Sequence, residues 1–170
     1  MLLMSKYAMM HRRRARGEVE IPSGVGTPIG GMTSGGGVAA AFDGDTAQTT
    51  TTGAYTGPSA AESVMWVGKT FSPGKVFSRA IAHSLTVGFQ SGANPTIVLG
   101  IYGKNGSAPA NATDGTLISD QPSFTDLNAS MSQELVSIDL VTAWDHIWLR
   151  VDPSANANAG VSELLLWEWA

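Results

Sequence analysis

The sequence predicts an all-β protein, an antiparallel β-sandwich of the jelly-roll type with an extended N-terminal arm. The 170-residue chain contains 14% charged residues, whereas soluble domains typically contain about 25%. Short runs that alternate apolar and polar residues recur after residue 39, separated by the Gly, Pro, Asn and Asp of tight turns. Since no long amphipathic segments alternate with these runs, a parallel sheet is not expected.

Composition divides the chain into an arm, residues 1–37, and a body, residues 38–170. Residues 1–17 carry five basic side chains and no acidic one, whereas the other 153 residues carry five basic and fourteen acidic ones. Residues 21–37 contain seven glycines and two prolines, which predict a flexible linker or docking arm. The four methionines among the first ten residues leave a later start as an alternative. The charge follows the apolar stretch, unlike in a secretory signal.

Five segments of the body are predicted to be its main strands: residues 76–89, 96–102, 135–140, 146–151 and 161–169. The expected core-facing side chains include Ile81 in the first, Val136 and Ile138 in the third, and Ile147 and Leu149 in the fourth. The last segment is apolar on both faces, so we expect it to lie between two other strands.

Three motifs occur in order along the body. They are residues 41–46 (AFDGDT), residues 101–106 (IYGKNG) with 112–118 (ATDGTLI), and residues 147–151 (IWLRV) with 160–167 (GVSELLLW). Together they resemble the discoidin, or coagulation-factor type C, domain, a galactose-binding-like jelly roll that also occurs in many carbohydrate-binding modules. The chain departs from the family's pattern after the first motif, where Gln48 and four threonines stand in place of the usual Trp.

The resemblance implies a structural Ca²⁺ site. In the family, the first motif and a glutamate of the last strand hold this ion together, which here corresponds to Asp43, Asp45 and Glu163. Ca²⁺ takes six to eight oxygen ligands, so main-chain oxygens would complete the set. The alternative interpretation is a simple turn at Asp43 and Gly44 with an exposed Glu163.

The resemblance also implies a sugar site in loops at one end of the sandwich. Aromatic rings suit the apolar face of a pyranose, and polar groups orient it. Tyr55, Phe124 and Trp144 lie in or beside polar loops and are the candidate ligand-binding residues. Trp66 and His83 are aromatic too, but their apolar surroundings favour positions in the core.

Several function classes are disfavoured by what the sequence lacks. It contains no nucleophile elbow, no HExxH motif and no phosphate-binding loop, so we do not expect an enzyme. No apolar run reaches the roughly 18 residues of a membrane span. The acidic body argues against nucleic-acid binding, and the absence of cysteine excludes disulfides.

The arm, the glycine-rich hinge and the weakly charged sandwich favour a structural component of a bacteriophage or phage-like particle. In this interpretation residues 1–37 anchor the protein to other virion subunits, and the jelly roll of a head spike or tail fibre contacts host surface polysaccharide. A homo-oligomer assembled in the bacterial cytoplasm is expected. The alternatives are an architectural capsid or tail jelly roll without a ligand, and a free-standing carbohydrate-binding module.

Overall fold

The computed structural model describes residues 17–57, 60–90, 95–154 and 158–170. Within these ranges the chain forms strands and two short 3₁₀ helices, and no α-helix. The elements are β1 (Glu18–Glu20), β2 (Thr27–Gly30), β3 (Ser34–Gly35), η1 (Val38–Phe42), β4 (Ala54–Tyr55), η2 (Glu62–Val64), β5 (Trp66–Ser84), β6 (Thr96–Lys104), β7 (Thr116–Leu117), β8 (Ser123–Thr125), β9 (Ser132–Val136), β10 (Ala143–Pro153) and β11 (Gly160–Trp169). The predicted all-β class is confirmed.

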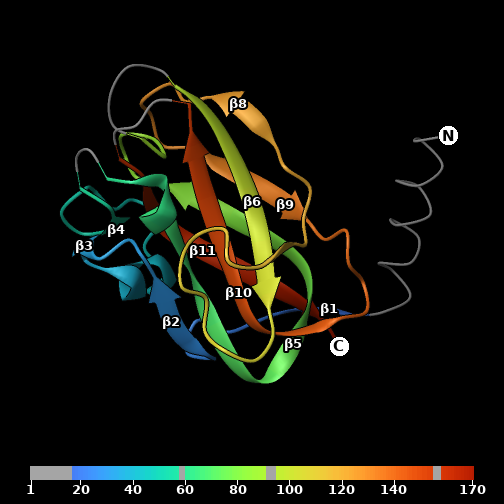
Figure 1. Cartoon of the computed structure of the whole chain (residues 1–170). Coiled ribbons are helices and arrows are strands. Elements are labelled where there is room, and N and C mark those ends of the chain that lie inside the picture. The colour runs from blue at the N-terminus through green and yellow to red at the C-terminus, as the bar shows by residue number, and fades with distance from the viewer. Residues whose placement is uncertain (1–16, 58–59, 91–94, 155–157) are drawn as a thin grey trace, which may run out of the picture.

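The strands form two packed layers joined by the long strand β5 (Figure 1). The first part of β5 pairs with β2 and β10, and β10 pairs in turn with β6. The last part of β5 pairs with β9 and β11. All these pairings are antiparallel, so the predicted sandwich is confirmed. Strand β11 lies between β5 on one side and β4 and β1 on the other, as expected of a strand that is apolar on both faces.

The passage of β5 between the layers runs through Ser72, Pro73 and Gly74, residue types that are typical of a turn. The strand continues through this segment and bends there (Figure 1). The bend packs closely on β10, because a Cβ atom at Gly74 would lie 2.9 Å from the carbonyl of Trp144. Glycine is therefore needed for this contact rather than for a chain reversal.

The core is built from the inward faces of both layers. Ile147, Leu149 and Val151 of β10 are fully buried, as the alternation predicted. Leu164 and Leu166 of β11 face them within the same cluster. This contiguous core ties the first and last strands of the body together.

Over residues 80–82 and 135–138 the alternation was predicted correctly but the wrong face was assigned to the core. In β5, Ala80 and Ala82 are fully buried, whereas Ile81 is half-buried on the outer face. After β9, Ile138 is 55% exposed, while the preceding Leu135 is buried. The small alanines leave room for the leucines of β11, with which they pair, so side-chain volume rather than hydrophobicity selects the inward face.

The predicted arm also differs from the structure over its second half. Three short strands lie within residues 18–35 and pair with the sandwich, so the body begins before residue 38. Glycine permits this packing, since a Cβ atom at Gly30 would lie 2.6 Å from the carbonyl oxygen of Trp66. Pairing with β5 and β11 offsets the entropic cost of ordering a glycine-rich segment. Residues 1–16, the basic part of the arm, lie outside the described residues.

Candidate functional site

The turn of the first motif lies directly on the last strand. The amide of Gly44 donates a hydrogen bond of 2.8 Å to the Glu163 carboxylate. Gly44 has a φ of +86°, a conformation that favours glycine. The hydroxyl of Ser162 lies 3.2 Å from the carbonyl of Thr46 but closer, at 2.7 Å, to the carbonyl of Ser84, so the Gly44 bond is the main polar link between the turn and β11. The expectation that Asp43 and Glu163 are neighbours is confirmed by this junction.

A buried glutamine organises the Asp43 side of the junction. The Gln48 amide nitrogen lies 2.8 Å from each carboxylate oxygen of Asp43 and donates to the carbonyl of Ala40 at 3.2 Å. Gln48 is 3% exposed, and its amide oxygen is buried without a hydrogen-bond partner. In the sequence, Gln48 stands out only as a departure from the family's pattern, five residues after Asp43.

The electrostatics of the junction are unfavourable for a second negative charge. Burial, with a smaller contribution from the nearby charge of Asp43, raises the pKa of Glu163 to about 6, against the hydrogen bond from Gly44 and the charge of Lys69. Burial lowers the pKa of Lys69. Glu163 is 1% exposed, so the predicted exposed alternative for this residue is wrong.

Only two of the three predicted cation ligands meet at the junction. The Asp45 carboxylate instead accepts the amide of Ala47 at 2.8 Å and lies in an exposed position. Over the described ranges no group of three or more His, Asp or Glu side chains could hold a metal ion. The groups at the junction that could hold a hard cation are the carboxylates of Asp43 and Glu163, whereas Gln48 presents its amide nitrogen, not its oxygen, to Asp43.

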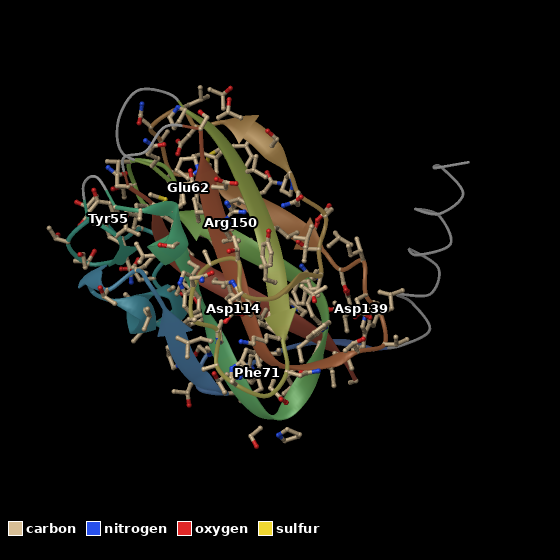
Figure 2. The ribbon with its side chains drawn as sticks, in the orientation of Figure 1. Tyr55, Glu62, Phe71, Asp114, Asp139 and Arg150 are labelled. Carbon is tan, nitrogen blue, oxygen red and sulfur yellow. The ribbon has the colours of Figure 1, made fainter. Side chains whose placement is uncertain are left out.

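The predicted aromatic ligand residues lie at opposite ends of the sandwich. Tyr55 pairs with Gly160, whose amide donates to the carbonyl of Phe89 at 2.8 Å. The ring of Phe124 lies 5.9 Å from that of Phe89, so Tyr55 and Phe124 belong to the same end. Trp144 lies at the other end, at the start of β10. All three side chains are half-buried, and Tyr55 is labelled in Figure 2.

A buried carboxylate that sequence analysis missed holds the end that contains Tyr55 and Phe124. Asp126 is fully buried and accepts the amides of Gln90 at 2.8 Å and Asn128 at 3.0 Å. A Cβ atom at Gly88 would lie 2.1 Å from the same carboxylate. Asp126 therefore fixes two loops against each other next to the Phe89–Phe124 pair.

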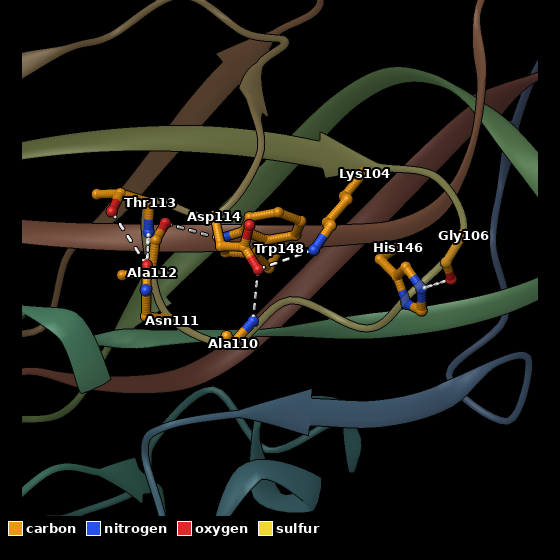
Figure 3. A network of polar contacts seen from close by, with 9 residues as sticks. All are labelled: Lys104, Gly106, Ala110, Asn111, Ala112, Thr113, Asp114, His146 and Trp148. Atoms are coloured by element: carbon orange, nitrogen blue, oxygen red, sulfur yellow. Dashed lines mark hydrogen bonds and ion pairs between the residues drawn. The ribbon is translucent and has the colours of Figure 1, made fainter.

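A second aromatic cluster covers the outer face of the layer formed by β2, β5, β10 and β6. Trp148 is fully buried there, stacks on Tyr102 and packs edge-on against Trp66. The segment after β6 folds over this cluster, and the Trp148 indole donates to the carbonyl of Ala112 at 2.9 Å (Figure 3). An ion pair of 2.8 Å between Lys104 and Asp114 closes the segment. The burial expected for Trp66 is confirmed, so this cluster is a structural core and leaves little aromatic surface for a ligand.

Comparison with known proteins identifies the fold. No protein-family model matches the sequence, and no curated protein matches it. Among solved structures, the family 32 carbohydrate-binding module of NanJ from Clostridium perfringens, in complex with galactose, matches with a TM-score of 0.59 at 17% identity, over 89% of this chain and 100% of the module. The CBM32 of AlyQ in complex with 4,5-unsaturated mannuronic acid matches with a TM-score of 0.53 at 16% identity, over 87% of this chain and 97% of the module.

Some similar domains form part of longer chains. A truncated AlyQ with CBM32 and alginate lyase domains matches with a TM-score of 0.57 at 15% identity, and the match covers 91% of this chain but 34% of that one. The fold of the described residues is thus the β-sandwich of these discoidin-like modules, as the motifs predicted. In the part of the chain that the structure describes, no helix is long and apolar enough to cross a membrane.

Proposed function

We propose that this chain is a carbohydrate-binding module. The observation that carries the proposal is the match over the full length of a galactose-binding module, together with the turn-to-last-strand junction that closes the sandwich. Its site is the end that contains Tyr55 and Phe124. Two half-buried rings and loops fixed by a buried carboxylate provide a preorganised surface of the kind that binds a sugar. Binding rather than catalysis is its function.

The experiment compares binding of the full chain and of single variants to arrayed glycans and to bacterial surface polysaccharide. Tyr55→Ala is expected to reduce retention on a bound glycan at least ~10-fold, a loss of about 1.4 kcal/mol. Tyr102→Ala is the matched control, because Tyr102 is also half-buried but lies in the aromatic cluster on the outer face of the sandwich. The proposal is abandoned if the folded chain binds no glycan, or if both variants bind like the wild type.

We further propose that the module is displayed on a phage or phage-like particle. The support is the basic segment before Gly17, with five basic side chains and no acidic one, next to an acidic body. Such a segment suits docking on an acidic neighbouring subunit, and host surface polysaccharide is then the ligand. Detection of the protein in purified particles would support this role; its absence from them would leave the free-standing module.

An ion at the junction of Asp43 and Glu163 is proposed as a structural Ca²⁺. When bound, the cation would neutralise two carboxylates that repel each other. Asp43 and Glu163 would hold it, with main-chain oxygens as neutral donors. Its effect is on the stability of the sandwich rather than on the sugar contact.

A further inference from the structure

The end of the molecule opposite Tyr55 contains an open groove that is not part of the site described above. It has a volume of about 370 Å³ and lies between the segment that enters β2 and the bend of β5. This volume falls in the range of small-molecule sites, about 300–1,000 Å³. We call it the bend groove, and its walls include Val25, Thr27, Thr70, Ser72, Pro73 and Lys75. Phe71, which also lines the groove, marks its position in Figure 2.

A buried lysine fixes the first wall of the bend groove. Lys69 is 2% exposed, and its ammonium group donates to the carbonyls of Ser23 and, at 2.9 Å, of Val25. The same group lies 4.5 Å from the centre of the Phe42 ring. Burying an ammonium group is costly unless it is well hydrogen-bonded. Its contacts with two carbonyls of one short segment hold that segment in a defined position.

A buried histidine fixes the second wall. His146 is 5% exposed, and its Nε2 lies 3.0 Å from the carbonyl oxygen of Gly106 (Figure 3). Its Nδ1 lies 2.8 Å from the Thr70 hydroxyl. The carbonyl can only accept, so in the neutral ring Nε2 carries the hydrogen and Nδ1 accepts from Thr70. The Thr70 oxygen keeps a free lone pair, and the groove is thus preorganised on both sides.

The lining of the bend groove combines apolar and hydroxyl groups without a net charge. Val25 and Pro73 are exposed apolar side chains, and Thr27 and Ser72 are exposed hydroxyls. Lys75 is paired with Glu168 at 2.8 Å, which neutralises the one ammonium group at the rim. A neutral pyranose has the matching chemistry, since it presents C–H groups on its faces and hydroxyls around its edge.

We propose that the bend groove is a second binding site, for a neutral pyranose, at the end of the sandwich opposite Tyr55 and Phe124. The proposal rests on the proposed carbohydrate-binding function. It adds a site that does not use the predicted aromatic residues. With sites at both ends, one molecule could bridge two glycan chains, which raises the apparent affinity for a polysaccharide surface.

The test is a titration of the full chain with galactose, glucose and N-acetylglucosamine, in which the NMR chemical shifts of the backbone amides are measured. We expect at least one sugar to shift the amides of Thr27, Thr70 and Ser72. Ser72→Trp fills the groove and should weaken that response at least ~10-fold. Ser132→Trp, at an exposed position on β9, is the matched control and should not change it. Thr27→Trp is a second obstruction in case Ser72→Trp does not fold.

The outcomes separate this proposal from the proposed function. Shifts near Tyr55 without shifts in the groove overturn the bend-groove site and leave the module function intact. Groove shifts that survive both Trp substitutions in folded protein also overturn it. If none of the three sugars shifts the groove amides, the groove is no pyranose site, whatever the glycan array shows for the other end.

Discussion

Glu163 is a carboxylate that the fold buries next to another carboxylate. It is tolerated because the amide of Gly44 donates to it and Lys69 lies nearby. A folded-state pKa of about 6 nevertheless exceeds the ordinary value of 4.5, so folding makes ionisation of Glu163 harder. The stability of the ion-free protein must therefore depend on pH through this residue.

We predict that Glu163 adds to the free energy of unfolding as the pH falls from about 7 to about 5 in the presence of a chelator. His83 contributes with the opposite sign over this range, because burial lowers its pKa, so the contribution of Glu163 is the difference between the wild type and Glu163→Gln. For an acid with a raised pKa, the folded state binds the proton more tightly, so protonation through pH 6 stabilises the fold until the unfolded carboxyl also protonates near 4.5. The gain is of the order of 1 kcal/mol, because solvent at the turn screens part of the shift. Urea denaturation across this pH range measures it.

Glu163→Gln should flatten this pH dependence, because an amide does not titrate. Glu168→Gln is the control, since Glu168 is half-buried in an ion pair with Lys75 and its loss should leave the pH 5–7 profile of Glu163 in place. An unchanged slope in Glu163→Gln would contradict the assignment of the pH effect to this residue.

We predict that Ca²⁺ stabilises the same junction. A chelator should lower the melting temperature, since an ion at 100 times its dissociation constant contributes about 2.7 kcal/mol. Asp43→Ala should abolish the effect, and Asp45→Ala should reduce it less, because the Asp45 carboxylate is engaged with Ala47. Calorimetry with and without EDTA decides this. If neither EDTA nor Asp43→Ala changes the melting temperature, the calcium proposal is wrong.

At the scale of the elements, β5 and β11 hold the sandwich together. Strand β5 belongs to both layers, and β11 pairs with β1, β4 and β5. The faces of β11 differ in burial, because Leu164 is 2% exposed in the core whereas Leu165 is only half-buried. Substitutions one residue apart on this strand should therefore have very different effects.

We predict that Leu164→Ala destabilises the fold by about 2–5 kcal/mol, the usual range for a leucine removed from a packed core. Leu165→Ala should lower the free energy of unfolding by clearly less, because Leu165 already contacts solvent and its truncation leaves no closed cavity. Chemical denaturation of the two variants gives the comparison. Equal losses would mean that the outer face of β11 is covered in solution by another surface, such as a second copy of the chain.

At the scale of the whole molecule, the two ends of the sandwich have different chemistry. The end with Tyr55 and Phe124 carries half-buried rings and the Asp126 anchor. The other end carries the bend groove, the start of β10 and, through β1, the point where the basic segment joins the body. A particle docked through this segment would leave the Tyr55 end free for a glycan.

We predict that removing residues 1–16 leaves the melting temperature of the body unchanged but abolishes incorporation into particles. Removing residues 1–37 should destabilise the body itself, because it also deletes β1, β2 and β3, which pair with β11, β5 and β4. Calorimetry and sedimentation of both truncations separate docking from folding. A monomeric full-length protein that is absent from particles would contradict the docking role.

The fold class and the interior position of the last strand could be predicted from the amino-acid pattern, because period-two alternation and turn residues are local features that can be read along the chain. The proximity of Asp43 and Glu163 was implied by the resemblance of the ordered motifs to the discoidin family. Which face of β5 turns inward was misassigned, because the choice depends on the side chains that pack opposite it.

Three features became known from the folded chain alone: Trp144 lies at the end opposite Tyr55 and Phe124, the Asp45 carboxylate accepts the amide of Ala47, and the glycine-rich segment adds strands to the sandwich. Nor does local pattern indicate that Lys69, Gln48 and Asp126 are buried and hydrogen-bonded to distant segments. The physical reason is the same in each case. A buried polar group is stabilised by partners that the folded chain brings to it, and those partners lie elsewhere in the sequence.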